Sequence, residues 1–145
     1  KNFMLETDNS LAEVEEVSNQ IYDDGDLAAP ISSGSFITRG MVVIPCSIKS
    51  LSGIANSYGA NLLVRAADVT LKERRPLVLV VRETPLHRGH LELMLSASSQ
   101  GAVILPPVPA FYHKPETITD LIHHTVGKVL DSLDIQHQLF ERWQG

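Results

Sequence analysis

Short apolar runs alternate along the chain with longer stretches in which apolar positions recur every three or four residues. Three runs are short, apolar on both faces and rich in Val or Ile, as buried strands are: residues 41–45, 77–82 and 102–105. The intervening and following segments have helical spacing: residues 51–57, 61–74, 84–99 and 117–133. Strands that alternate with helices predict an α/β fold, with a parallel sheet covered on both faces by helices.

Local signals set several helix boundaries. Ser10-Leu11-Ala12-Glu13 is a capping box, which predicts a helix start. The apolar positions of that helix have the spacing of one buried face: Leu11, Val14, Val17 and Ile21. Residues 28–40 are small and polar, as an ordered loop is. We expect Thr84-Pro85 to open the third of the later helices and Gly101 to close it.

Composition narrows the class of protein. A chain of 145 residues with 43% hydrophobic side chains fits a single domain. The net charge of -5 argues against a nucleic-acid partner, and residues 77–81, the longest apolar run, are far short of the roughly 20 residues that span a membrane. A single cysteine excludes an intrachain disulfide and favours the cytoplasm. Because Lys1 is not an initiator Met, we expect a fragment.

The candidate functional residues are those directly after each predicted strand, because ligands of an open parallel sheet bind beyond the carboxyl ends of its strands. After the first strand, Ser47 and Ser50 either cradle a phosphate or form an ordinary serine cap, and the spacing does not separate the two. Cys46 has no base near it in sequence and is expected to be a small buried residue. After the second strand, Arg82-Glu83 offers a phosphate clamp and a proton carrier, or a solvated ion pair.

Aromatic and histidine residues give weaker signals. The proline-rich segment after the third strand carries Phe111, which we expect in the core, and Tyr112, which we expect to line a pocket. The cations that end the helix before the second strand complement its dipole, although Lys72 remains open. The paired histidines are expected to be structural or on the surface rather than metal ligands: His87 with His90 and His123 with His124.

Several long segments resemble the UbiX flavin prenyltransferase family. The similar segments are residues 26–35, 45–55, 65–75, 82–86 and 101–113, and the similarity extends from Leu5 to Trp143. The resemblance implies a Rossmann-like (flavodoxin-like) domain covering residues 1–145. It also implies transfer of a dimethylallyl group from dimethylallyl monophosphate to N5 and C6 of reduced FMN, without a metal. The implied product is prenylated FMN for a UbiD-type decarboxylase.

The resemblance also assigns roles to individual residues. It implies FMN contacts from Ser47, Ile48, Lys49, Ser50 and Arg65. It implies that Lys72, Arg82, Tyr112 and Lys128 hold the donor phosphate, and that Trp143 closes over the pocket. Glu6, Lys72 and Glu83 would be catalytic. Since the leaving phosphate gains negative charge, we expect its cations to share one cavity.

The resemblance also bears on the assembly, and the chain departs from the family in two places. The resemblance implies a large homo-oligomer, typically a dodecamer, with the active site completed by neighbouring subunits. Lys128 lies where relatives often have Arg, and the family's first strand, Gly-rich turn, helix and second strand do not precede Lys1, so we expect an incomplete N-terminus. The alternative functions are a flavin-dependent decarboxylase of cysteine-like substrates with the same fold, or a non-enzymatic FMN-binding protein.

Overall fold

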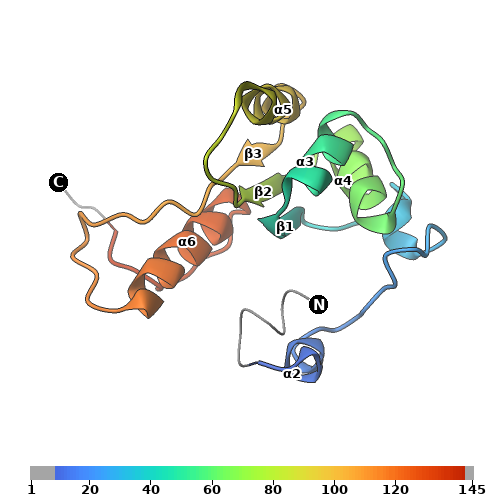
Figure 1. Cartoon of the computed structure of the whole chain (residues 1–145). Helices are drawn as coiled ribbons and strands as arrows, with labels where there is room; N and C mark the ends of the chain where they lie inside the picture. Colours follow the sequence, from blue (N-terminus) through green and yellow to red (C-terminus); the bar gives the residue numbers. More distant parts are fainter. Residues whose placement is uncertain (1–8, 143–145) are drawn as a thin grey trace.

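The computed structural model describes residues 9–142, and its centre is a parallel sheet (Figure 1). The strands are β1 (Met41–Cys46), β2 (Leu77–Val81) and β3 (Val103–Ile104), with β2 in the middle. Met41 pairs with Leu77, and Val78 pairs with Val103. All three predicted strands are therefore confirmed, within two residues at each end.

Helices connect and flank the strands. In chain order they are α2 (Leu11–Glu16), the 3-10 turn η1 (Pro30–Ser32), α3 (Ile48–Ala55), α4 (Leu62–Lys72), α5 (Arg88–Ser99) and α6 (Ile118–Ser132). Their caps follow the sequence closely at α6, where Thr117 and Asp120 form a capping box. Gly101, with φ of +108°, follows the end of α5 as expected. No helix among residues 9–142 is long and apolar enough to cross a membrane.

The alternating side chains of β2 divide the core into two layers. Leu77, Leu79 and Val81 belong to the cluster that α3, α4 and α5 complete, whereas Val78 and Val80 pack with Val129 of α6. Successive residues of a strand point to opposite faces, so β2 is buried on both. Figure 1 accordingly has α6 on one side of the sheet and α3, α4 and α5 on the other, which confirms the predicted α/β architecture.

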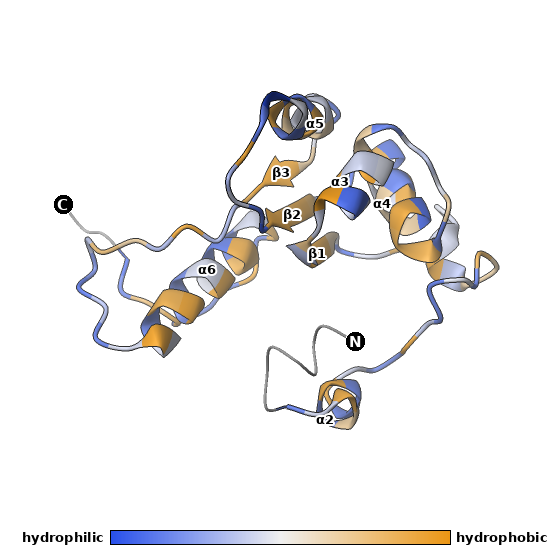
Figure 2. Ribbon diagram, in the orientation of Figure 1, coloured by the Kyte–Doolittle hydropathy of each residue, from blue (hydrophilic) through white to orange (hydrophobic). Residues whose placement is uncertain are grey.

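Helix α2 begins at the predicted capping box but has no buried face. The Glu13 amide donates to Ser10 Oγ at 3.3 Å, while the Glu13 carboxylate accepts from the Ser10 amide at 2.6 Å. Leu11 is 51% exposed and Val17, at the helix end, 85% exposed. The predicted burial is wrong within this chain because α2 lies on an extended segment, away from the sheet (Figure 2).

Helix α5 begins later than its sequence predicts. Its first residue is Arg88 rather than a residue next to Thr84-Pro85, so that prediction is wrong. The physical reason is a cap supplied by His87, whose Nδ1 accepts a hydrogen bond from the Gly89 amide at 3.0 Å. A ring nitrogen thereby satisfies one of the four amides that a helix start leaves without partners.

Candidate functional site

The start of α3 lies directly beyond the carboxyl end of β1. Ser47 is the N-cap, and its Oγ accepts from the Ser50 amide at 3.2 Å while lying 3.2 Å from Ser50 Oγ. The serine cap is thus confirmed. The exposed helix start also presents unpaired amides and two hydroxyls, a donor set that fits an anion. Ser50 and Lys49 line a cavity of about 710 Å³ with Tyr58 and Asn61.

Cys46 lies at the end of β1 and is fully buried, as expected. Burial raises the pKa of its thiol to about 11. Because the thiolate is the nucleophilic form, this cysteine is not suited to covalent chemistry at neutral pH.

Arg82 and Glu83 leave the sheet immediately after β2. Arg82 lines a cavity of about 390 Å³ with β1 residues, the proline-rich segment and α6, and it is the one charged side chain in the described lining. The other residues are mostly apolar and include Ile44, Pro107, Pro109, Ile118 and Ile122. The Glu83 carboxylate is exposed and accepts from the Thr84 amide at 3.0 Å. The arrangement pairs a cation with an apolar pocket at the carboxyl edge of the sheet.

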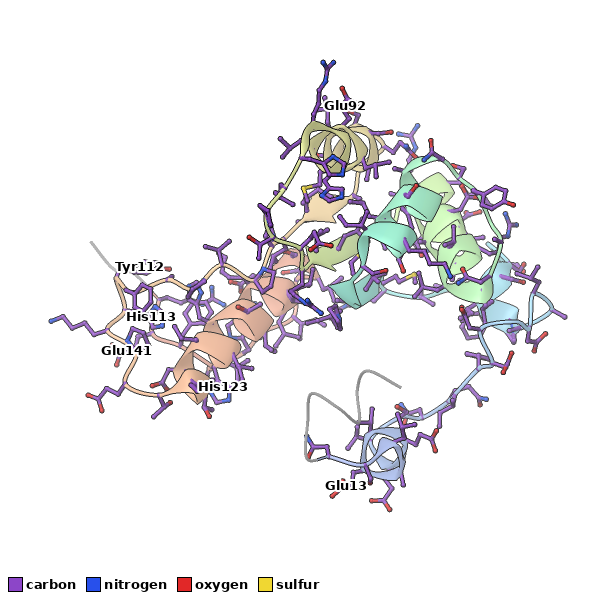
Figure 3. The ribbon with its side chains drawn as sticks, in the orientation of Figure 1. Glu13, Glu92, Tyr112, His113, His123 and Glu141 are labelled. Atoms are coloured by element: carbon purple, nitrogen blue, oxygen red, sulfur yellow. The ribbon has the colours of Figure 1, made fainter. Side chains whose placement is uncertain are left out.

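Tyr112 lines a different cavity, of about 670 Å³, between residues 112–117 and residues 139–142. Its hydroxyl lies 2.9 Å from His124 Nε2 on α6, and Figure 3 places Tyr112 beside His113 and Glu141. Phe111 is 69% exposed, so its predicted core position is wrong. The segment runs past the end of β3, and no described element covers that ring.

The segment after α6 folds back along the helix. Arg142 donates two hydrogen bonds to the Asp131 carboxylate, at 2.6 and 3.2 Å, and the His137 ring lies 3.1 Å from the same carboxylate. The Arg142 guanidinium and His137 hold the pKa of Asp131 below its usual range. Gly127 makes room for this packing, since a Cβ there would lie 2.3 Å from the Phe140 ring. Sequence reasoning had no signal for these contacts.

Lys72 does not join Arg82 within this chain. It ends α4, before β2 begins, and its ammonium pairs with the Glu73 carboxylate beside Gly34. Arg82 follows the other end of β2, a five-residue strand about 16 Å long. The expectation that Lys72 and Arg82 share one cavity is therefore wrong for a single chain. The reason is that α4 ends at the amino edge of the sheet, and Lys72 is its last residue.

The remaining predicted residues are also dispersed. Arg65 donates to the Ser32 carbonyl at 3.1 Å and pairs with Asp68 at 3.2 Å, and the 710 Å³ cavity of Lys49 and Ser50 does not include it. Lys128 is exposed on α6 and lines neither the Arg82 cavity nor the Tyr112 cavity. Glu6 and Trp143 lie outside the described residues.

Three of the paired histidines make contacts within the fold. His124 is buried and bonded to Tyr112, and the rings of His87 and His90 lie 3.6 Å apart. Within residues 9–142 no three His, Cys, Asp or Glu side chains gather as a metal ion would require.

Comparison with known proteins places these features in a family. The model of the family described as Flavoprotein matches residues 3–142. The chain is 63% identical over 143 residues to the flavin prenyltransferase UbiX of Salmonella typhimurium, covering 97% of this chain and 76% of the relative. It is 56% identical over 145 residues to the UbiX of Thauera aromatica, covering 100% of this chain and 75% of the relative.

Solved structures agree with the sequence relatives. A UbiX crystal structure in complex with FMN and dimethylallyl pyrophosphate has a TM-score of 0.96 at 50% identity, covering 99% of this chain and 76% of that one. A dodecameric FMN-dependent UbiX-like decarboxylase from Escherichia coli O157:H7 has a TM-score of 0.95 at 51% identity, covering 99% and 77%. The chain therefore belongs to the Flavoprotein family and, within it, to the UbiX flavin prenyltransferases.

Proposed function

We propose that the protein transfers a dimethylallyl group from dimethylallyl monophosphate to N5 and C6 of reduced FMN. Membership of the UbiX flavin prenyltransferases carries this proposal, and FMN is present in a solved relative of the same fold. That relative was solved with dimethylallyl pyrophosphate, so the monophosphate remains a prediction from the resemblance. The function is that of an enzyme, a transferase that binds a flavin.

The start of α3 is the proposed anchor of FMN. Ile48 and Lys49 carry first-turn amides there, Ser47 and Ser50 carry hydroxyls, and the positive end of the helix dipole favours a phosphate. The reduced flavin supplies the electron-rich nitrogen and carbon that accept the alkyl group. Arg65 is proposed as a further FMN contact on the resemblance alone.

Arg82 is the proposed phosphate clamp. Its cavity offers an apolar lining to a short branched alkyl group and one guanidinium to the phosphate at its edge. As the carbon–oxygen bond breaks, negative charge grows on the phosphate, and a fixed cation stabilises that charge more than it stabilises the ground state. Glu83 is proposed to move the proton that leaves the flavin, with Glu6 and Trp143 at the same site.

Lys72 is proposed to reach the phosphate of a neighbouring copy. Its place at the amino edge of its own sheet leaves Arg82 beyond the far end of β2. The resemblance implies a dodecamer with shared active sites, and one solved relative is dodecameric. In such an assembly Lys72 of one copy and Arg82 of another would serve the same phosphate. Tyr112 and Lys128 lie outside the Arg82 cavity within one chain and are proposed at that site on the resemblance alone.

The reaction is tested by incubating the full-length protein with reduced FMN and dimethylallyl monophosphate under nitrogen. We expect the flavin mass to rise by one dimethylallyl unit. An unchanged flavin mass, with protein that still binds FMN, would count against the proposed function.

The shared site is tested by mixing two inactive variants, Lys72→Ala and Arg82→Ala, under conditions that exchange subunits. Some sites in the mixture combine an intact Lys72 with an intact Arg82 from different copies, so we expect activity to return in part. If both residues serve the same site from one copy, every site keeps one defect and the mixture stays inactive.

A decarboxylase is the second candidate. Two solved relatives carry that name: the Escherichia coli protein and the phenylacrylic acid decarboxylase from Aquifex aeolicus, which has a TM-score of 0.80 at 46% identity and covers 88% of this chain. A flavin-dependent decarboxylase of cysteine-like substrates has no phosphate leaving group, so Lys72→Ala would leave its activity intact. Flavin binding without turnover on either substrate would instead favour a non-enzymatic FMN-binding protein.

The route of the product is also proposed from the resemblance. Prenylated FMN would pass to a UbiD-type decarboxylase, and the single cysteine supports a cytoplasmic setting. Activation of an apo UbiD-type decarboxylase by the reaction mixture, and not by unreacted FMN, tests the first of these.

A further inference from the structure

A buried histidine holds the hydroxyl of an exposed tyrosine at the proposed phosphate site. Tyr112 is 65% exposed, whereas His124 is only 9% exposed, and the Tyr112 hydroxyl lies 2.9 Å from His124 Nε2. The tyrosine belongs to the segment before α6 and the histidine to α6 itself. One hydrogen bond thus fixes where the only polar atom of the Tyr112 side chain lies.

Two rings pack against the His124 ring. His113 stacks on it with ring centroids 4.7 Å apart and an interplanar angle of 10°, and the Phe140 ring lies 5.0 Å away. Both ring nitrogens of His113 are buried and have no hydrogen-bond partner among the described residues, so this ring contributes packing rather than a competing bond. The orientation of Nε2 toward Tyr112 is therefore preorganised.

The charges that face His124 come from every element around it. Lys128 follows one turn later on α6, and Asp120 precedes it by one turn, with a carboxylate that accepts from the Thr117 and Glu116 amides. His113 and Tyr112 face it from the preceding segment. In the segment after α6, Arg142 and His137 are both bonded to Asp131. Burial, followed by His113 and Lys128, lowers the pKa of His124, so the free protein has a neutral ring at pH 7.

We propose that His124 is a positioning residue for the donor phosphate: it sets the direction of the Tyr112 hydroxyl and takes up a proton when the phosphate binds beside Tyr112 and Lys128. This inference rests on the proposed function, which assigns Tyr112 and Lys128 to the phosphate. A protonated ring carries hydrogen on both nitrogens, so Nε2 must donate to Tyr112. The Tyr112 proton is then free to point at a phosphate oxygen.

Proton uptake and phosphate binding strengthen each other. The phosphate charge favours the cationic ring, and the cationic ring favours the phosphate, with equal coupling in both directions. The pKa of His124 is lowered in the free protein and rises in the complex. Phosphate affinity is therefore greatest below the lowered pKa and declines as pH rises through the range where histidine titrates.

The test compares three variants of the full-length protein across about pH 5.5 to 8.5. His124→Gln keeps a hydrogen-bonding group but cannot titrate, His124→Phe removes the bond, and His123→Gln is the matched control on the same helix. KM for dimethylallyl monophosphate and kcat are measured separately. The substrate phosphate titrates equally with both proteins, so the difference in KM between the wild type and His124→Gln at each pH removes that contribution.

We expect KM of the wild type to rise with pH more steeply than KM of His124→Gln, at similar kcat. His124→Phe should raise KM about three- to tenfold, the loss of one hydrogen bond, and His123→Gln should match the wild type. A merely structural His124 would give the same pH dependence in the wild type and in His124→Gln, which overturns the inference.

Imidazole NMR with inorganic phosphate as the probe separates this inference from the proposed function. We expect phosphate to raise the pKa of His124 in the wild type, and a Lys128→Ala variant to weaken the effect. If no prenylated flavin forms but phosphate still raises this pKa, the proposed function fails and the inference stands. If prenyl transfer occurs and the pKa does not move, the inference fails alone.

Discussion

On one face of the sheet, Leu79 and Val81 pack under α3, α4 and α5, whereas on the other face Val78 and Val80 meet α6 alone. The first layer brings together twelve buried residues from five elements and their flanks, and the second has three. The α6 side also holds the Arg82 cavity, with Ile118 and Ile122 largely exposed along it.

The contrast separates stability from chemistry. The α3–α5 layer excludes water and buries Cys46, so it supplies most of the apolar burial that stabilises the fold. The α6 layer leaves apolar surface and cations accessible beside the carboxyl edge of the sheet. Binding sites commonly lie on such incompletely covered surfaces, next to a rigid scaffold.

Leu79→Ala should have the largest effect on the comparison. The Leu79 side chain projects from β2 and is fully buried under α3, α4 and α5, so its loss leaves a cavity that the layer cannot fill. We expect the free energy of unfolding to fall by about 2–5 kcal/mol, measured by urea denaturation. A loss below about 1 kcal/mol would mean that this layer is loosely packed.

Cys46 should react slowly with alkylating reagents while the protein is folded. With its pKa raised to about 11, against an ordinary value of 9.0, the thiolate fraction at pH 8 falls roughly 100-fold. Mass spectrometry after iodoacetamide treatment, with urea-unfolded protein as the control, measures this difference. Equal labelling of folded and unfolded protein would contradict the described burial.

Val81→Ala and Val80→Ala form a matched pair on opposite faces of the same strand. Both side chains are buried, but Val80 borders the Arg82 cavity and Val81 lies in the larger layer. Two lost methyl groups cost about 1.5–2.5 kcal/mol when their surroundings are closely packed. We expect Val81→Ala to reach that range and Val80→Ala to cost less, and the reverse order in urea denaturation would refute the comparison.

Ile122→Ser should change the stability of an isolated chain least. The side chain is 55% exposed on α6, so little burial is lost and we expect a change within about 0.5 kcal/mol. A larger loss in the assembled protein than in the isolated chain would show that another element covers this surface. Sedimentation and urea denaturation at several protein concentrations distinguish the two states.

Local patterns predicted much of the fold. The apolar run of β2, the capping box at Ser10 and the Gly101 terminus depend on neighbouring residues, and each is where the sequence predicts it. The same holds for burial of Cys46 at a strand end. In these cases the physical cause lies within a few residues of the feature.

The site was harder to predict because its causes lie further away. Lys72 sits at the amino edge because of where α4 ends, a fact about packing rather than spacing. The apolar face of α2 indicates a partner, but the spacing cannot say which element or copy supplies it. The sequence does not distinguish His124 from other histidines, because its contact with Tyr112 forms only in the folded chain.

The shape of the Tyr112 cavity depends on the absence of a side chain at Gly127. A Cβ at this position would lie 2.3 Å from the Phe140 ring and 2.6 Å from the His137 ring, so any larger residue would push the chain end off the helix. Phe140 and Arg142 form one wall of that cavity, and Tyr112 forms another. Gly127 thus determines the width of the opening, although it is not one of the residues that line the cavity.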